Sequence, residues 1–259
     1  MMVFKEKNNI VGKTRNPLSS FIDIVYPPRC HICGKFLPYR EAKFPLNYIC
    51  SDCLRDMSPI SSPICSICGI PFSTNRGDNH MCEDCTRKRP YYELARAPYF
   101  YSGKLKGAIQ RFKYNSETHL GKPFGGLLLN FIQKTFHKMD EYIIIPVPLH
   151  KKKLRERGYN QSLLLAKALS KKLRLKLDYL SFIRIRYTQN QASLRTMDRR
   201  ENVKNAFSVT DVKAIKAKKI LLVDDVFTTG FTLNECAKSL KESGAAEIIC
   251  VSLARTPFD

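Results

Sequence analysis

The sequence predicts an α/β protein in which a mostly parallel sheet covered by helices follows a small cysteine-rich domain. Near the carboxyl terminus, apolar runs at 218–227 and 245–255 flank a helix-like segment at 232–244. Such strand, helix and strand alternation is typical of parallel sheets. Near the amino terminus, eight of the ten cysteines crowd into one short stretch. We therefore expect three parts: a tail with a short helix over residues 1–28, a cysteine-rich domain over 29–90 and an α/β domain over 91–259.

Length and composition indicate a globular protein with an anionic ligand. The chain has 259 residues, of which 44% are hydrophobic and 26% charged, so it can bury a core. Lys and Arg number 44 against 23 Asp and Glu, which gives a formal net charge of +21. Between Lys151 and Lys219 there are 20 basic residues and only 5 acidic ones. This excess favours a polyanionic partner or an anionic substrate, and charge alone does not separate the two.

The sequence shows no signal for export or for membrane insertion. The first residues, MMVFKEKNNIVGKTR, lack the apolar run of an export signal. No later stretch reaches the roughly 18 uncharged apolar residues that a membrane-spanning helix needs. We therefore expect a cytoplasmic protein that does not enter the membrane.

The clustered cysteines form four Cys-x-x-Cys pairs, which indicate metal rather than disulfides in a reducing compartment. Two such pairs supply the four thiolates that a structural zinc prefers, so eight ligands imply two zinc ions. Pairing in sequence order is our preferred arrangement, and a cross-braced arrangement is the alternative. The eight expected ligands are Cys30, Cys33, Cys50, Cys53, Cys65, Cys68, Cys82 and Cys85.

The cysteine-rich domain admits two interpretations. The zinc ions can simply hold together a segment too small for a core of its own. Alternatively, the domain is a zinc ribbon that binds nucleic acid through aromatic and basic side chains. The candidates for such contacts are Tyr39, Arg40, Tyr48, Phe72, Arg76, Arg87, Lys88 and Arg89.

Hydrophobic periodicity places the remaining elements of the α/β domain. Continuous β-branched runs bounded by prolines indicate buried strands, and apolar residues three and four apart indicate helices. In chain order we expect a strand at 95–103, helices at 105–114 and 123–138, a strand at 141–150, a helix at 159–175, and apolar runs at 180–185 and 206–209.

The most informative stretch is LLVDDVFTTGFT, residues 221–232. Asp224 and Asp225 end a buried strand, and a loop of Thr228, Thr229 and Gly230 then leads into a helix. Small residues around a glycine let backbone amides converge on a phosphate at the positive end of that helix. Carboxylates would repel the phosphate but suit sugar hydroxyls, so the stretch predicts a ribose 5-phosphate site. An ordinary turn with capping threonines would not need two consecutive acids.

This stretch resembles the binding motif of type I phosphoribosyltransferases, although Phe227 stands where a smaller aliphatic residue is usual. The whole chain resembles the ComF (ComFC) family, competence-associated proteins in which a double zinc ribbon precedes a phosphoribosyltransferase domain. The motifs that carry the resemblance are PPRCHICG, FKY at 112–114, PVPLHKKKLRERGYNQ at 146–161, and Gln191, Leu194, Arg199, Asn202 and Phe207 before DDVFTTG.

The resemblance implies binding of phosphoribosyl pyrophosphate (PRPP) together with Mg²⁺. It also implies catalysis through an oxocarbenium-like state, in which Asp224, Asp225 and Arg199 take part. Arg199 would belong to a mobile hood at 191–202 that covers the pyrophosphate. For Lys113 a ligand contact and a surface position remain equal alternatives. The residues expected to bind PRPP are Asp224, Asp225, Val226, Thr228, Thr229, Gly230, Phe231, Thr232, Pro148, Leu149, Lys153 and Arg157.

The resemblance further implies that the protein handles single-stranded DNA during natural transformation, beside a helicase-like partner. Three functions stay open at this point. The first is a phosphoribosyltransferase that also binds single-stranded DNA, with an unknown acceptor. The second is an adaptor that binds DNA and uses the PRPP pocket for sensing or scaffolding without turnover. The third is a nucleobase salvage phosphoribosyltransferase, which would leave the zinc ribbons unexplained.

Overall fold

A parallel sheet lies at the centre of the computed structural model, which describes residues 26–37, 48–73, 77–187 and 203–257. Its strand order is β1-β7-β6-β3, and β2 continues the edge that β1 forms on β7. The predicted parallel sheet is thus confirmed. The bounds are β1 Leu94–Arg96, β2 Tyr99–Phe100, β3 Tyr142–Pro146, β6 Lys219–Phe227 and β7 Glu247–Arg255.

The two inner strands are β6 and β7, and their sequences explain this position. Nearly every residue of both strands is buried, because apolar side chains point to both faces of the sheet. β3 pairs with β6 along its whole length, from Tyr142 opposite Lys219 to Pro146 opposite Val223. On its other side, β6 pairs with β7 over a longer stretch, which reaches Phe227. Hence β6 extends four residues beyond the last position that β3 covers.

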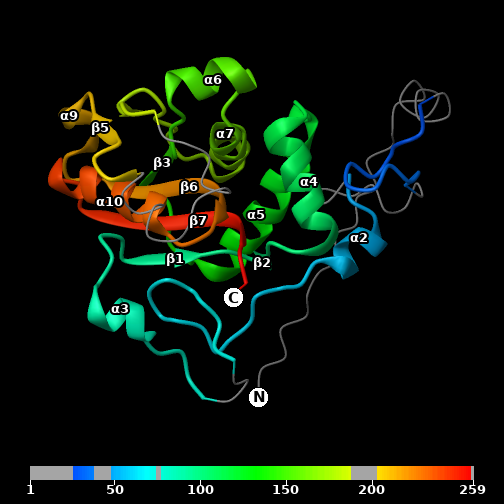
Figure 1. The fold of residues 1–259 in the computed structure, drawn as a ribbon, viewed down its shortest axis with the longest axis horizontal. Helices are drawn as coiled ribbons and strands as arrows, with labels where there is room; N and C mark the ends of the chain where they lie inside the picture. The colour runs from blue at the N-terminus through cyan, green and yellow to red at the C-terminus, as the bar shows by residue number, and fades with distance from the viewer. Residues whose placement is uncertain (1–25, 38–47, 74–76, 188–202, 258–259) are drawn as a thin grey trace, which may run out of the picture.

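Helices cover both faces of the sheet (Figure 1). α4, α5 and α7 share one hydrophobic core with β6 and β7, and α10 shares a second core with the other face. All four helices lie where the apolar periodicity predicted them. Their bounds are α4 Gly103–Tyr114, α5 Gly121–Thr135, α7 Gln161–Leu173 and α10 Phe231–Glu242.

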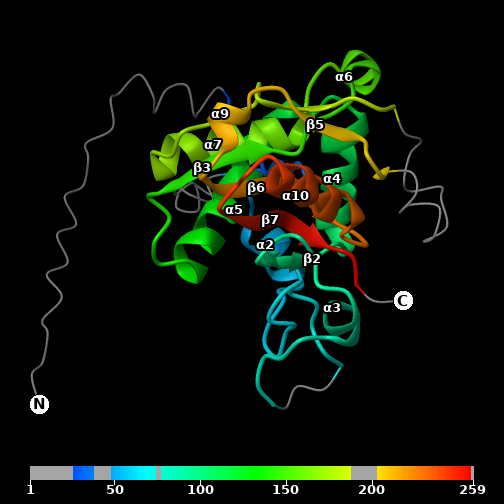
Figure 2. The same ribbon diagram turned by 90° about the vertical axis from the view of Figure 1, so that its left-hand side faces the viewer.

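The two cysteine-bearing segments pack against opposite faces of the sheet, as Figure 2 helps to follow. The first, with α2 (Ser51–Asp56), joins the core of α4, α5 and α7 through Ile32, Ile49 and Met57. The second, with α3 (Glu83–Arg87), joins the core of α10 through Ile67. Each segment therefore uses the sheet domain as its hydrophobic core, since it is too small to supply one.

The remaining elements lie in the connections between the strands and helices of the sheet. A basic helix, for which the sequence analysis named no element, follows β3 directly, and two short strands pair antiparallel outside the main sheet. Among the described residues, no helix is long and apolar enough to span a bilayer. The helix predicted within residues 1–28 and the hood at 191–202 fall outside the described residues, apart from positions 26–28. The bounds are η1 Thr118–Leu120, α6 Lys151–Arg157, β4 Phe182–Arg184, β5 Phe207–Val209 and α9 Val212–Ile215.

Two glycines in the helices provide a matched test of the packing between α5 and α7. A Cβ at Gly125 would lie 2.5 Å from the Cβ of Ala168, whereas a Cβ at Gly107 in α4 would meet nothing within 4 Å. We expect Gly125→Ala to lower the free energy of unfolding by about 1 to 3 kcal/mol through overpacking. We expect Gly107→Ala to raise it by about 0.5 to 1 kcal/mol, because alanine favours a helix. Urea denaturation measures both, and equal signs would contradict this packing.

Candidate functional site

Paired carboxylates lie where β3 ends and β6 continues. Pro146 is the last residue of β3 and pairs with Val223, so Asp224 is the first residue of β6 that β3 leaves uncovered. Asp224 is half-buried and Asp225 is buried. Ligands of parallel sheets bind in such crevices beyond the carboxyl ends of strands. The crevice is thus a consequence of unequal strand lengths.

Two neighbouring helices hold the carboxylates in place. The Nζ atom of Lys113, near the end of α4, lies 2.7 Å from Oδ1 of Asp225. Ser162 in the first turn of α7 donates a hydrogen bond of 2.9 Å to Oδ1 of Asp224. The amide of Asp225 donates a second bond to the same oxygen, also at 2.9 Å. Among the described residues, nothing donates to either Oδ2 atom, so both remain available to a ligand.

Burial and mutual repulsion set the protonation of this pair. Burial raises the pKa of Asp224 to about 7, and the nearby charge of Asp225 adds to this rise. Burial alone would lower the pKa of Lys113, but the two carboxylates raise it above its ordinary value. Near neutral pH, Asp224 therefore changes between its neutral and ionised forms beside the contact of Lys113 with Asp225.

The loop after β6 presents free backbone amides. The N–H groups of Thr228, Thr229 and Gly230 donate to no acceptor among the described residues. Gly230 has φ +79° and precedes α10, whose amino-terminal end adds positive potential. Glycine is required there, because a Cβ would lie 2.7 Å from the ring of Phe227. Free amides at a helix mouth form a ready site for a phosphate.

Cations from α6, α4 and β4 lie close to one another beside the acidic pair, which Lys113 of α4 contacts directly. On α6, Lys153 and Arg157 are half-buried, while the other basic residues of this helix are exposed. Burial lowers the pKa of Lys153, and the positive charges of Arg184, Arg157 and Lys113 lower it further. These four cations are therefore near enough to one another to repel, although the Arg157 guanidinium also donates to Gln161 Oε1 at 2.8 Å. A group of neighbouring cations favours a ligand that carries several negative charges.

The other predicted site residues lie around the same crevice, with one exception. Pro148 and Leu149 are half-buried directly after β3, and Val226 is buried within β6. Phe231 and Thr232 form the first turn of α10. Arg199 falls outside the described residues.

The structure also brings in residues that the prediction of the site missed. Lys113 was left undecided, and its FKY motif was the available signal. Ser162 and Arg184 carried none, because their sequence neighbourhoods are those of an ordinary amphipathic helix and an apolar run. Asn160 caps α7 by accepting from the amides of Ser162 and Leu163.

The eight paired cysteines form two compact clusters in sequence order. The first cysteine cluster is Cys30, Cys33, Cys50 and Cys53, and the second cysteine cluster is Cys65, Cys68, Cys82 and Cys85. In each, the four sulfur atoms lie within 4.8 Å of one another. Backbone amides point at the sulfurs, as Cys82 N does at Cys65 Sγ over 3.3 Å. Four thiolates at this spacing fit a tetrahedral structural zinc.

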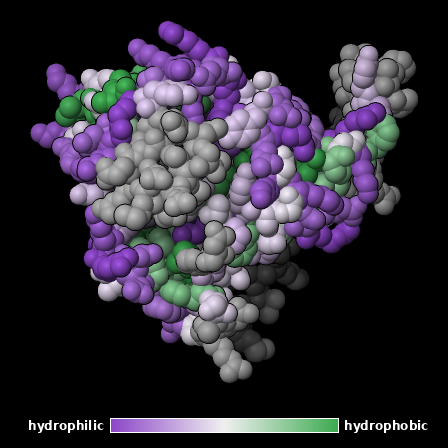
Figure 3. Space-filling view, viewed as in Figure 1, coloured by the Kyte–Doolittle hydropathy of each residue, from purple (hydrophilic) through white to green (hydrophobic). Residues whose placement is uncertain are grey.

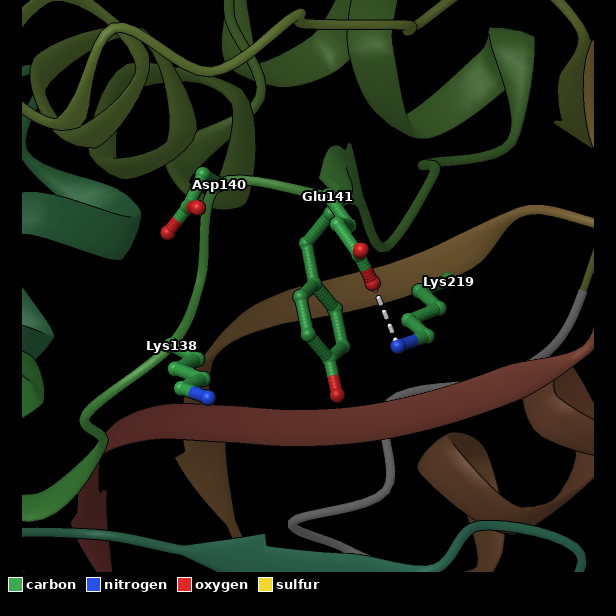
Figure 4. A pocket seen from close by; sticks show the side chains of 5 residues that line it. Lys138, Asp140, Glu141 and Lys219 are labelled. Atoms are coloured by element: carbon green, nitrogen blue, oxygen red, sulfur yellow. Dashed lines mark hydrogen bonds and ion pairs between the residues drawn. The ribbon is translucent and has the colours of Figure 1, made fainter.

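A second hollow lies at the opposite end of the sheet. It is lined by Lys138, Asp140, Glu141, Tyr142 and Lys219, and Figure 4 shows these side chains around the start of β3. Glu141 and Lys219 neutralise each other in an ion pair of 2.5 Å. Its lining thus has two basic and two acidic side chains in balance, so this hollow attracts an anion less than the crevice does.

Family comparisons agree with this geometry. Residues 21–86 match the model of a double zinc ribbon domain, and residues 160–258 match that of a phosphoribosyl transferase domain. Competence protein F of Haemophilus influenzae is 35% identical over 81% of this chain and 91% of its own length. The chain belongs to the ComF family. The resemblance and the fold predicted from the sequence are thereby confirmed.

Other relatives show the same extent of similarity. DNA utilization protein YhgH of Escherichia coli O157:H7 is 32% identical over 80% of this chain and 90% of its own length. Competence protein ComFC of Bacillus subtilis is 29% identical over 82% of this chain and 86% of its own length. Among solved structures, the glutamine PRPP amidotransferase from B. subtilis is 17% identical, with a TM-score of 0.35, and the match covers 52% of this chain and 26% of that one.

The raised pKa of Asp224 predicts a pH-dependent loss of stability. Between pH ~4 and ~7 the folded protein holds a proton at Asp224 that the unfolded chain has released, so this group lowers the free energy of unfolding as the pH rises. Asp224→Asn keeps the acceptor for Ser162 and removes this effect. We expect the free energy of unfolding of the variant, relative to that of wild type, to increase from pH 4 to pH 8. Since one pKa unit corresponds to about 1.4 kcal/mol, the increase should be on the order of several kcal/mol.

Urea denaturation at a series of pH values checks this prediction, and Asp178→Asn is the control. Burial tends to raise the pKa of Asp178, but hydrogen bonds from Ser181 and Leu180 lower it overall. Its contribution is therefore lost only below the ordinary pKa of an aspartate, so its stability difference should stay constant from pH 5 to pH 8. A constant difference for Asp224→Asn would contradict the assigned direction.

Proposed function

We propose that this protein binds PRPP with Mg²⁺ at the crevice beside Asp224, acts as a phosphoribosyltransferase on an acceptor still to be identified, and binds single-stranded DNA in natural transformation. One observation carries the first part. Paired carboxylates, unpaired loop amides and converging cations lie at one edge of one sheet, and a phosphorylated sugar carrying pyrophosphate has a matching group for each. No single smaller anion has a matching group for all three of these features.

Each group of residues has a distinct role in this proposal. The amides of Thr228, Thr229 and Gly230 hold the 5-phosphate, and the hydroxyl of Thr232 lies in the first turn behind them. Asp224 and Asp225 accept hydrogen bonds from the ribose hydroxyls through their Oδ2 atoms. Their negative charge stabilises the positive charge that develops on the sugar when the bond to pyrophosphate breaks.

The leaving pyrophosphate is bound by cations. Lys153 and Arg157 approach it from α6, and Arg199 covers it from the hood segment. Mg²⁺, a hard cation that prefers oxygen ligands, neutralises the pyrophosphate when bound, and the free carboxylate oxygens of the acidic pair suit it. Lys113 holds Asp225 in place through their contact of 2.7 Å while the sugar becomes cationic.

Binding of single-stranded DNA rests on family membership and on the surface around the crevice. Relatives are named competence and DNA utilization proteins. Exposed Tyr114 lies against Arg157, and exposed Tyr187 lies against Lys152, with ring-to-cation distances of 5.1 Å and 4.7 Å. Hydrophilic residues cover α6 at the top of Figure 3. Aromatic rings beside cations suit stacked bases and phosphates. A helicase-like partner is implied by the family alone.

The described aromatic candidates of the cysteine-bearing segments stack on histidines. Tyr48 stacks on His31, and Phe72 stacks on His80 with ring centroids 3.9 Å apart. The basic candidates Arg87, Lys88 and Arg89 are exposed, whereas Tyr39, Arg40 and Arg76 fall outside the described residues. We therefore assign base stacking to the α6 side, keep the three exposed cations as candidates for phosphate contacts, and assign a stabilising role to the zinc ions.

Titration with PRPP in excess Mg²⁺ tests the pocket. We expect Lys153→Gln and Arg157→Gln each to weaken PRPP binding about tenfold, because a charge-assisted hydrogen bond contributes about 1.5 to 3 kcal/mol. The double variant Asp224→Ala, Asp225→Ala should show no saturable binding. Lys151→Gln is the matched control, since Lys151 is an exposed cation on the same helix. Calorimetry measures all four.

Equal affinities for the Lys151 and Lys153 variants would contradict the pocket, because the effect would then reflect net charge. A pyrophosphate-release assay separates the functions that share this pocket. Release with single-stranded DNA or another acceptor supports a transferase, release with a free nucleobase alone supports a salvage enzyme, and binding without release under any condition supports the adaptor.

DNA binding should weaken steeply with salt. Each phosphate contact contributes a slope of about −0.7 on a plot of log affinity against log salt concentration. We expect binding of a fluorescent oligonucleotide to weaken at least tenfold between 50 and 200 mM salt, as about three contacts would require. Tyr114→Ala and Tyr187→Ala should weaken binding at every salt concentration without changing the slope, since stacking is not ionic. A flat salt response would contradict this surface.

A further inference from the structure

Three arginines of the sheet domain hold the two cysteine clusters by their backbone carbonyl groups. From α4, Arg111 donates to Ile32 O at 2.7 Å beside the first cysteine cluster. At the second cysteine cluster, Arg96 of β1 donates to Ser66 O at 2.9 Å, and Arg255 of β7 donates to Cys68 O at 2.6 Å. These carbonyls belong to the turns that carry the sulfur ligands, so their positions depend on the closed clusters.

Arg255 is the unusual member of this group. Its side chain is buried, with only 6% of the residue exposed, and it forms no ion pair with a carboxylate of the described residues. A buried guanidinium needs a compensating negative charge. A zinc ion with four thiolates carries a net charge of −2, and the second cysteine cluster supplies this charge beside Arg255. Without metal, both the charge and the fixed position of Cys68 O would be lost.

From Arg255 a chain of contacts leads to the phosphate loop. The guanidinium carbon lies 4.2 Å from the centroid of the Phe227 ring. That ring packs against Gly230, where a Cβ would come within 2.7 Å of it. Phe227 is buried at the end of β6 and shares a hydrophobic cluster with Cys68. The backbone of the loop at Gly230 thus packs on the ring of Phe227. That ring packs on Arg255, which binds the second cysteine cluster through Cys68 O.

We propose that Arg255 and Phe227 are positioning residues that couple zinc in the second cysteine cluster to PRPP at the loop of residues 228–230. This inference rests on the proposed function. Metal holds Arg255 under Phe227, and Phe227 holds the loop with its amides together. Binding at either site therefore favours the other, and linkage requires the two effects on affinity to be equal.

Equilibrium competition between the full-length protein and a zinc chelator tests this coupling, with and without saturating PRPP and excess Mg²⁺. In wild type, we expect PRPP to raise the zinc affinity of the second cysteine cluster at least fivefold, the lower limit of usual allosteric coupling. Chelation of zinc by PRPP itself would change the apparent affinity in the opposite direction. A Cys33→Ser background weakens the first cysteine cluster, so that the remaining tight zinc reports on the second.

Variants distinguish coupling through Arg255 and Phe227 from a general effect of packing the second cysteine-bearing segment against the sheet. Arg255→Met and the milder Phe227→Leu should abolish the effect of PRPP on zinc affinity, so that the affinities with and without PRPP are equal. Each variant should still bind two zinc ions. Arg96→Met removes another guanidinium from the same turn but does not touch Phe227, so it should lower zinc affinity and keep the fivefold PRPP effect. Loss of the effect in Arg96→Met to the same degree would overturn the proposed path.

The remaining outcomes separate the coupling from the proposed function. If PRPP binds wild type with a saturable isotherm and leaves the zinc affinity unchanged, the coupling is wrong and the pocket stands. If PRPP shows no saturable binding to the two-zinc protein, the proposed function is wrong and the coupling falls with it.

Discussion

The contact between Lys113 and the acidic pair is the constraint on which the site depends. Two carboxylates in sequence at the end of a buried strand repel each other and resist burial. One cation from α4 and one hydroxyl from α7 offset this cost. The helices on this face are therefore not interchangeable covering, because each must bring one named group to the point where β3 ends.

That requirement gives the cysteine-rich segments a structural purpose. Arg111 lies two residues before Lys113 on α4 and binds the carbonyls beside the first cysteine cluster. Arg255 ends β7 and binds the second. The two clusters thus hold the helix that carries the cation and the strand that supports the phosphate loop. Because they pack on opposite faces of the sheet, neither can replace the other.

Sequence predicted the parts of this structure whose signals are local. Continuous apolar runs identified β6 and β7, cysteine spacing identified the metal ligands, and the acids followed by a threonine and glycine loop identified the crevice. For Lys113 the FKY motif was the only signal, and it does not show that Asp225 lies beside this lysine, more than a hundred residues further along the chain. Arg255 has a basic side chain in an apolar strand, and only the tertiary fold shows which charge it meets.

Phe227 shows why a departure from a family motif can be informative. A smaller aliphatic residue at this position would leave the loop glycine without a ring to rest on and the guanidinium without a surface to stack on. The large ring fills that space and requires glycine at 230, since no other residue would fit beside it. In the proposed coupling, the ring therefore does not weaken the loop of residues 228–230. It would transfer support for this loop from the strand itself to Arg255, and through Arg255 to the turn of the second cysteine cluster.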